Sequence, residues 1–199
     1  MNFLAHILLS GDDKKIQIGN FIGDAIKGKD YLHYPVQIKK GILLHRQIDA
    51  FTDANAIVHR SKKRLDKRYG HYAGVIIDII YDHFLCVNWG SYSKEPLDSY
   101  IAIFYKTIQL DFDLIPKETQ RFIPSLLKQD WFTKYQSIEG IAKVLQGMEK
   151  QIKHNIPLHR GVEDLKEKYD LFNADFNEFF PLLQEHSKSI IQILDNEYK

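Results

Sequence analysis

The stretch Tyr72–Trp89, YAGVIIDIIYDHFLCVNW, constrains the fold of this chain more than any other segment. Apolar residues occupy almost every angular position that a helix through it would present, and a helix that is apolar on all sides is usually buried. Yet the stretch contains Asp78, Asp82 and His83. Asp78 and Asp82 are four residues apart and share one helical face, and His83 lies beside that face.

These ionisable residues need partners. A buried carboxylate without a partner loses much of its solvation free energy and is driven towards its protonated form. Two carboxylates on one buried face therefore require a cation, a metal ion or a shared proton. We predict that this helix carries part of a metal site and that the other ligands come from elsewhere in the chain. The alternative is a buried salt-bridge network.

A second helix, expected over residues 37–51, has ionisable side chains on its apolar stripe. Two isoleucines, His45 and Asp49 fall at positions i, i+4, i+7 and i+11, which places both polar residues on the face that the isoleucines begin. Arg46 is adjacent. Asp49 could instead simply pair with Arg46. Thr52-Asp53 is expected to cap a following helix that runs through a basic segment.

The N-terminal part adds further candidates. The apolar segment Asn2–Ser10 contains His6, and its periodicity does not decide between helix and strand. A helix is expected over Lys15–Lys27, with Asn20 and Asp24 on one face. A lone histidine in an apolar segment is more often a hydrogen-bonded core residue than a ligand, so His6 gains meaning only together with the others.

The candidate residues share a chemistry that suits a divalent metal. Imidazole and carboxylate ligands are typical of Mn, Fe, Zn or Mg, and the lack of thiolate ligands argues against a structural zinc site. No glycine-rich phosphate loop and no G-x-S-x-G motif is present. The set, all before residue 90, is His6, Asp24, His45, Asp49, Asp78, Asp82 and His83.

The remainder of the chain is also helical in pattern. Apolar residues recur at helical spacing over residues 97–107, Ser137 resembles a helix start, and Pro124 and Pro181 are expected to interrupt helices. Strand-like alternation is scarce, and no internal repeat or linker occurs. We therefore expect one compact all-α domain over residues 1–199, with seven to nine helices.

Charge is balanced overall but not along the chain. The net charge of +1 predicts no nucleic-acid partner. Residues 59–71 nevertheless hold six basic side chains and one acid, which indicates either a docking surface for an acidic partner or a solvated helix face. The basic residues are Arg60, Lys62, Lys63, Arg64, Lys67 and Arg68.

The sequence also bears on location. The single cysteine, Cys86, cannot form an internal disulfide and fits a reducing compartment. The first residues show neither a basic n-region nor a small-residue cleavage signal, and no apolar run reaches the length of a membrane span. A cytoplasmic location without a membrane span is the expectation.

Several motifs occur in an order that resembles the acyl-carrier-protein phosphodiesterase family. They are NFLAH (residues 2–6), GNFIGD (19–24), HYP (33–35), GILLHRQIDAFTD (41–53) and DIIYDHFL (78–85). Weaker similarities follow at Trp131, VLQGM (144–148) and FFP (179–181). The resemblance spans nearly the whole chain and is most specific in its first 90 residues.

This resemblance implies an all-helical fold related to the HD-type metal-dependent phosphohydrolases. It also implies a divalent metal cofactor, Mn²⁺ above others, and hydrolysis of holo-acyl carrier protein to 4'-phosphopantetheine and the apo carrier. One departure matters. The usual HD signature is His followed by Asp, whereas here Asp82 precedes His83, so ligand roles do not transfer one for one.

With that chemistry in view, the expected metal ligands are Asp24, His45, Asp78 and Asp82. The expected catalytic residues are His6, Arg46, Asp49 and His83. Among these, Arg46 would hold a phosphate oxygen, and Asp49 would orient His45 or Arg46. His6 and His83 are the next candidates for ligands, and His83 could instead protonate the departing serine oxygen. The acidic carrier protein would be the partner of the basic segment. The alternatives are an HD-type hydrolase of a nucleotide or other small phosphoester, and a non-enzymatic helical binding protein.

Overall fold

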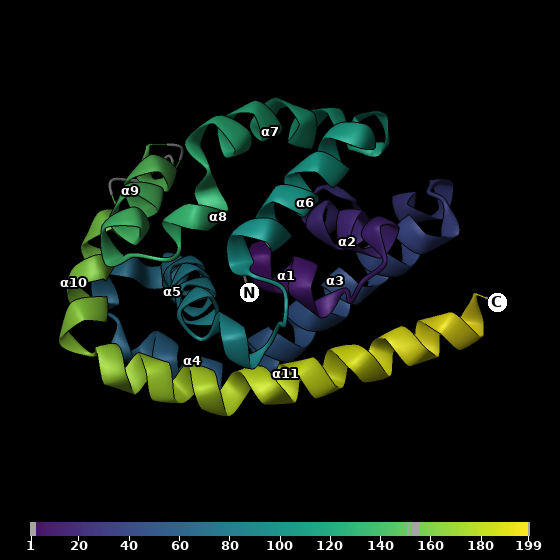
Figure 1. Ribbon diagram of the computed structural model, residues 1–199. Helices are drawn as coiled ribbons and strands as arrows, with labels where there is room; N and C mark the ends of the chain where they lie inside the picture. Colours follow the sequence, from purple (N-terminus) through teal and green to yellow (C-terminus); the bar gives the residue numbers. More distant parts are fainter. Residues whose placement is uncertain (1–2, 151, 153–155, 199) are drawn as a thin grey trace.

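Helices surround a central helix of the same chain (Figure 1). The computed structural model describes residues 3–150, 152 and 156–198, so Asn2 of the NFLAH motif lies outside the described residues. The α-helices are α1 (Phe3–Leu9), α2 (Lys14–Phe21), α3 (Val36–Ala54), α4 (Ala56–Arg64), α5 (Ala73–Val87), α6 (Leu97–Leu110), α7 (Lys117–Gln129), α8 (Trp131–Lys134), α9 (Ile138–Glu149), α10 (Gly161–Glu167) and α11 (Tyr169–Glu197).

Short 3₁₀ helices join several of these. They are η1 (Gly23–Ala25), η2 (Asp30–His33), η3 (Lys67–Tyr72), η4 (Trp89–Ser91), η5 (Phe112–Leu114) and η6 (Leu158–Arg160). The described residues contain no strand, which confirms the predicted all-α class. They form eleven α-helices rather than seven to nine, because α8 and α10 are too short to be recognised by periodicity. None of the helices in this described part is both long and apolar enough to cross a membrane.

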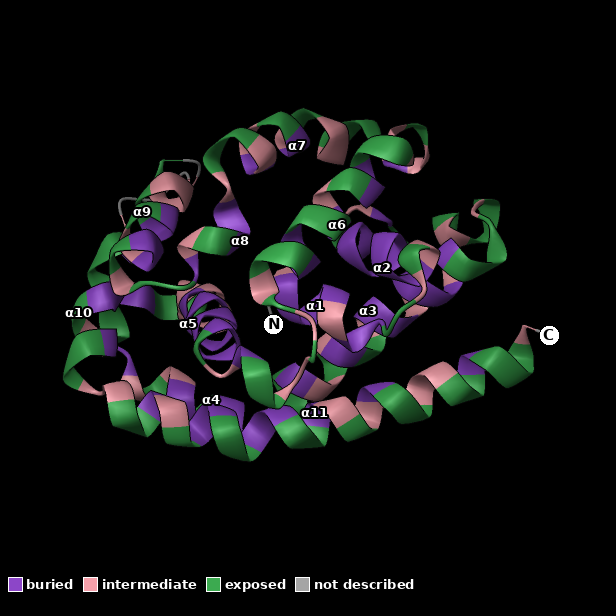
Figure 2. Cartoon of the chain, viewed as in Figure 1, coloured by how far each residue is buried: buried purple, intermediate pink, exposed green. Residues whose placement is uncertain are grey.

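The central helix is α5, as the sequence predicts. Its side chains from Ile76 to Cys86 are buried except for Asp78, which is half-buried. It packs against α1, α4, α9 and α11, and its buried surface is continuous in Figure 2. Burial on all sides explains why apolar residues surround this helix.

Two glycines let α2 and α3 cross in backbone contact. A Cβ atom on Gly19 would lie 2.1 Å from the Ile38 carbonyl oxygen, and one on Gly41 would lie 2.2 Å from the Ile16 carbonyl oxygen. No other residue type fits at either position without separating the helices. This close crossing places Asn20 of α2 against His45 of α3.

The end of α2 differs from the prediction. A continuous helix over Lys15–Lys27 is wrong, because α2 ends at Phe21 and η1 follows it. Gly23 lets this turn lie against the His45 ring, because a Cβ at this position would lie 2.3 Å from the Cγ atom of the ring. Asn20 and Asp24 therefore do not share one α-helical face. They approach the His45 ring from two different elements.

Two other boundary predictions also fail. The side chain that caps α4 belongs to Asn55, which accepts a hydrogen bond from the Ile57 amide, and not to Thr52 or Asp53. Pro124 and Pro181 lie inside the continuous helices α7 and α11. Both prolines are on exposed faces, where water can solvate the carbonyl group that loses its helical donor.

The long helix α11 spans the molecule and is fastened to α4 (Figure 1). Its buried Asp175 accepts hydrogen bonds from Arg60 Nε at 2.8 Å, Arg64 Nε at 2.7 Å and Ser61 Oγ at 2.7 Å. Arg68 pairs with Asp66 at 2.7 Å. Half of the basic segment, its three arginines, is therefore engaged in pairs within the fold.

Candidate metal centre

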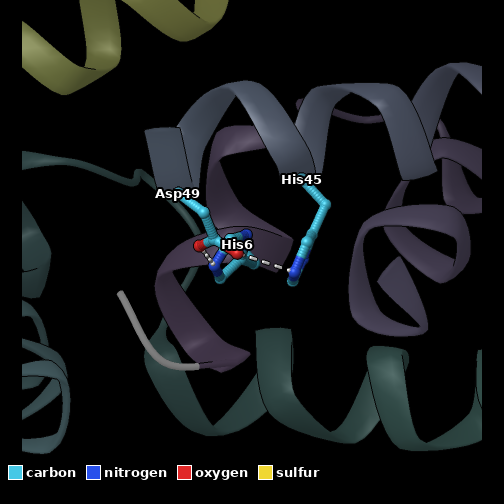
Figure 3. Close-up of side chains that lie close together, drawn as sticks. All are labelled: His6, His45 and Asp49. Carbon is cyan, nitrogen blue, oxygen red and sulfur yellow. Dashed lines mark ion pairs between the residues drawn. The ribbon is translucent and has the colours of Figure 1, made fainter. Parts of the chain in front are cut away.

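Three side chains from two helices converge on one point (Figure 3). His6 comes from α1, and His45 and Asp49 come from one face of α3. His6 Nε2 lies 3.2 Å from Asp49 Oδ1, and His45 Nε2 lies 3.0 Å from Asp49 Oδ2. One ligand atom from each residue lies within 4.8 Å of the others, so this group could hold a metal ion.

Asn20 contacts both imidazole rings at Nδ1, the nitrogen that faces away from Asp49. Its side-chain oxygen lies 2.7 Å from His6 Nδ1, and its main-chain oxygen lies 2.8 Å from His45 Nδ1. The amide group is itself oriented, because its NH₂ donates to the His6 carbonyl and to Ser10 Oγ. Metal-binding histidines are typically held in this way by an oxygen at the nitrogen that does not bind the metal.

This arrangement needs a positive charge at its centre. Each ring has an oxygen acceptor at both nitrogens: Asn20 on one side and a carboxylate on the other. A neutral imidazole has only one N–H, so it leaves one nitrogen lone pair facing an oxygen. Protonating both rings would place two cations in a buried stack with a centroid distance of 4.2 Å. A metal ion next to Nε2 of both rings removes this conflict.

The pKa values favour the charged forms of His45 and Asp49 but the neutral form of His6. Burial disfavours the charged form of His45, but hydrogen bonds with Asp24 and Asp49 outweigh this and raise its pKa to about 9. Burial lowers the pKa of His6, against the opposing effect of Asp49. Burial raises the pKa of Asp49, yet its bonds to His45 and His6 prevail and hold it well below its usual range.

Asp24 lies at the open side of the group. Its Oδ1 is 3.1 Å from His45 Nε2, and this hydrogen bond lowers the pKa of Asp24. Its side chain is 80% exposed and that of Asp49 is 39% exposed, whereas the two histidine side chains are 3% and 5% exposed. The centre is therefore closed by the imidazoles on one side and reachable by a solute past the carboxylates.

Asp82 has a different position. Its buried carboxylate accepts hydrogen bonds from the main-chain amides of Leu4 at 3.0 Å and Ala5 at 3.3 Å, at the start of α1. Burial raises the pKa of Asp82 to about 7, against the opposing effect of the Leu4 and Ala5 amides. Asp82 thus fixes the helix that carries His6. The group of possible ligands in the described residues does not include Asp24, Asp78 or Asp82, and the role of these three as ligands stays a prediction.

His83 lies on another side of α5. Its Nδ1 is 2.7 Å from the Tyr135 carbonyl oxygen, and its Nε2 is 3.0 Å from the Tyr169 hydroxyl. Burial lowers its pKa. The adjacent residues Asp82 and His83 therefore point to different partners, and a catalytic role for His83 stays a prediction.

Arg46 is anchored close to the same helical turn. Its Nη2 donates to the Ile26 carbonyl oxygen at 3.0 Å, and its guanidinium lies over the Tyr31 ring at 5.2 Å. These contacts hold the side chain against η1 and η2 while leaving other donors of the guanidinium available.

The sequence of the chain matches a family of known proteins. The model of the family described as acyl carrier protein phosphodiesterase matches residues 1–183. The chain belongs to this family. It is 30% identical to the acyl carrier protein phosphodiesterase of Photorhabdus laumondii over 95% of this chain and 96% of that protein. The proteins of that name from Enterobacter sp. strain 638 (28% identical, 95% and 98% covered) and Klebsiella pneumoniae strain 342 (30%, 91% and 94%) are also similar.

Membership in the acyl carrier protein phosphodiesterase family confirms the predicted family and the prediction of an enzyme, a hydrolase. The match includes all the residues of the candidate centre. No solved structure matches the chain, so the relation to HD-type hydrolases stays a prediction.

Four residues that the sequence marks as candidates lie together here, but not in the predicted roles. Asp24 and His45 are predicted as ligands and His6 and Asp49 as catalytic residues, whereas the group that could hold a metal ion is His6, His45 and Asp49. The sequence pattern gives Asn20 no role beyond its spacing from Asp24. Its own signal is its position in GNFIGD, next to Gly19, whose missing side chain allows the close helix crossing.

Proposed function

We propose that this chain is a metal-dependent phosphodiesterase that hydrolyses holo-acyl carrier protein to 4'-phosphopantetheine and apo-acyl carrier protein. The observation that carries the metal dependence is the pair of buried imidazoles with oxygen acceptors at both nitrogens. The carrier protein as substrate rests on the names of the relatives, which are acyl carrier protein phosphodiesterases.

The residues that would hold the metal are His6, His45 and Asp49, with Asp24 as the exposed fourth ligand. Two imidazoles and two carboxylates suit Mn²⁺, which is the ion we propose. When bound, such an ion supplies a positive charge for the phosphoryl oxygens and lowers the pKa of water. Asn20 keeps both Nε2 atoms directed at the centre.

Arg46 would position the phosphodiester group of the substrate. Its guanidinium, held over Tyr31, has donors left to bind a non-bridging phosphate oxygen beside the centre. The prediction that His83 protonates the departing serine oxygen is harder to reconcile with its contacts, because both ring nitrogens already have protein partners.

The test is direct. Purified protein with Mn²⁺ and holo-carrier protein should release phosphopantetheine, which mass spectrometry detects as a loss of mass on the carrier. Chelator and His45→Ala should each abolish the release. An unchanged carrier mass with several holo-carriers and several divalent metals would refute the proposed activity.

A small basic surface is a candidate docking site for the acidic carrier. Lys63 and Lys67 form no ion pair with any described residue, and both line a hollow of about 570 Å³ together with His59, Lys62 and His71. The hollow lies close to the candidate centre. Lys62 contacts Asp53 at 3.2 Å, and Asp53 follows Asp49 by one turn of α3, which is a rise of about 5.4 Å. A carrier protein whose phosphodiester lies at the centre is a whole domain, so its surface would also reach this hollow.

Charge reversal tests this docking. Lys63→Glu with Lys67→Glu should raise KM for holo-carrier about tenfold, because like charges now face each other, and should leave hydrolysis of bis(p-nitrophenyl) phosphate unchanged. The control is Lys128→Glu with Lys143→Glu, which makes the same change in charge at exposed positions on α7 and α9. Equal effects of the two pairs on carrier hydrolysis would contradict this docking surface. Arg60 and Arg64 are unsuitable targets because Asp175 holds them.

A further inference from the structure

A pocket of about 290 Å³ opens beside the candidate metal centre. It lies between α1, the end of α2 with η1, and the first turns of α7. Its walls include Phe3, Phe21, Ile22 and Phe122, and Asp24 lies on its edge. Because Asp24 also contacts His45, the pocket adjoins the centre.

Three phenylalanines make the apolar wall rigid. The Phe3 ring packs against Phe21 with a centroid distance of 5.2 Å and against Phe122 at 5.8 Å. Phe122 packs edge-on against Trp131 at 4.9 Å. Rings held on several sides preserve the shape of a pocket, whereas free side chains would collapse into it.

The polar groups of the pocket lie near its edge. Lys27 and Glu118 are exposed, and Thr119 is half-buried. An apolar wall with a few polar groups is typical of sites for small organic molecules, and the volume is at the low end of their range. A neutral, narrow ligand fits this better than a charged or bulky one.

We propose that this aromatic pocket binds the pantetheine arm of the substrate, a neutral chain with two amides and a branched, dimethyl-substituted carbon. The proposal rests on the proposed function. A phosphodiester on the centre has the carrier serine on one side and this arm on the other, so the arm needs its own site next to the metal. The pocket adjoins Asp24, has an apolar wall for the dimethyl carbon, and has polar groups at its edge for the amides.

A binding experiment tests the pocket without relying on catalysis. Pantetheine, which has no phosphate, is titrated calorimetrically into wild type and Thr119→Trp, whose indole would fill the space. We expect measurable binding to wild type and a loss of at least tenfold in the variant. Ser125→Trp is the matched control on α7, since Ser125 does not line the pocket. If Thr119→Trp does not fold, Glu118→Trp, at an exposed lining position, replaces it.

Kinetics separate this proposal from the proposed function. Thr119→Trp should raise KM for holo-carrier about tenfold, whereas Ser125→Trp should leave it within twofold of wild type. If wild type releases phosphopantetheine but Thr119→Trp equals Ser125→Trp both in pantetheine binding and in KM for holo-carrier, the arm does not bind here. Failure of wild type to bind pantetheine at millimolar concentration also overturns the proposal. Failure of wild type to act on any holo-carrier refutes the proposed function instead.

Discussion

At the scale of the residue, the centre depends on one asparagine as much as on its candidate ligands. Asn20 supplies an oxygen to each histidine and is itself fixed by the His6 carbonyl and Ser10. The main-chain contact to His45 survives substitution, but the side-chain contact to His6 does not. The two contacts can therefore be separated experimentally.

Asn20→Leu should weaken Mn²⁺ binding by about 10- to 100-fold, because His6 loses the oxygen that orients its ring. Asn173→Leu, an amide replaced on α11 away from the centre, should bind Mn²⁺ as wild type does. Calorimetric titration of both variants provides the measurement. Wild-type affinity in Asn20→Leu would show that the ring of His6 needs no such support.

The pKa of His45 predicts how the metal-free protein depends on pH. A histidine pKa raised from 6.5 to about 9 in the fold stabilises the folded state fully below pH 6.5. This contribution, on the order of 3 kcal/mol, is lost as the pH rises to about 9. Urea unfolding from pH 6 to 9.5 should show the loss in wild type but not in His45→Gln. Parallel pH profiles of the two proteins would contradict the raised pKa.

At the scale of the element, the glycine contact between α2 and α3 positions the site. Gly19 and Gly41 bring the two backbones together, and this brings the Asn20 carbonyl oxygen within 2.8 Å of His45. Asp82 plays a related part for α1, since it binds the amides at the start of the helix that carries His6.

Gly41→Ala should lower the free energy of unfolding by about 2–3 kcal/mol and weaken Mn²⁺ binding, because the added Cβ meets backbone 2.2 Å away. Gly147→Ala in α9 is the matched control. A Cβ there contacts nothing within 4 Å, and the change should stabilise by up to about 1 kcal/mol. Denaturant unfolding compares them. A Gly41→Ala protein as stable as wild type would contradict the close helix contact.

At the scale of the whole molecule, the sequence predicts the helical class and the buried central helix, and it marks as candidates the residues that meet at the centre, though not in the roles proposed for them here. Periodicity shows which face of α3 is buried, and so it placed His45 and Asp49 together. It does not show which helices meet. The acids of α5 therefore looked like the core of the site, although Asp82 binds the start of α1 instead.

The remaining errors have the same origin. The tight turn at Gly23 depends on contact with His45, 22 residues later, and the engagement of Arg60 and Arg64 depends on Asp175, more than 100 residues later. Local patterns cannot contain such information. The local pattern also does not show that the prolines of α7 and α11 lie on exposed faces, where water can solvate the helix backbone.

The most direct test of the metal centre is Mn²⁺ binding followed by electron paramagnetic resonance, in which free Mn²⁺ gives the signal. Wild type should bind Mn²⁺ saturably and so lower the signal of the free ion. His6→Ala, His45→Ala and Asp49→Ala should each raise the dissociation constant for Mn²⁺ at least 100-fold. His59→Ala, a histidine outside the centre, should match wild type. Mn²⁺ binding that persists at wild-type affinity in His45→Ala and Asp49→Ala would contradict a metal site at this point of the fold.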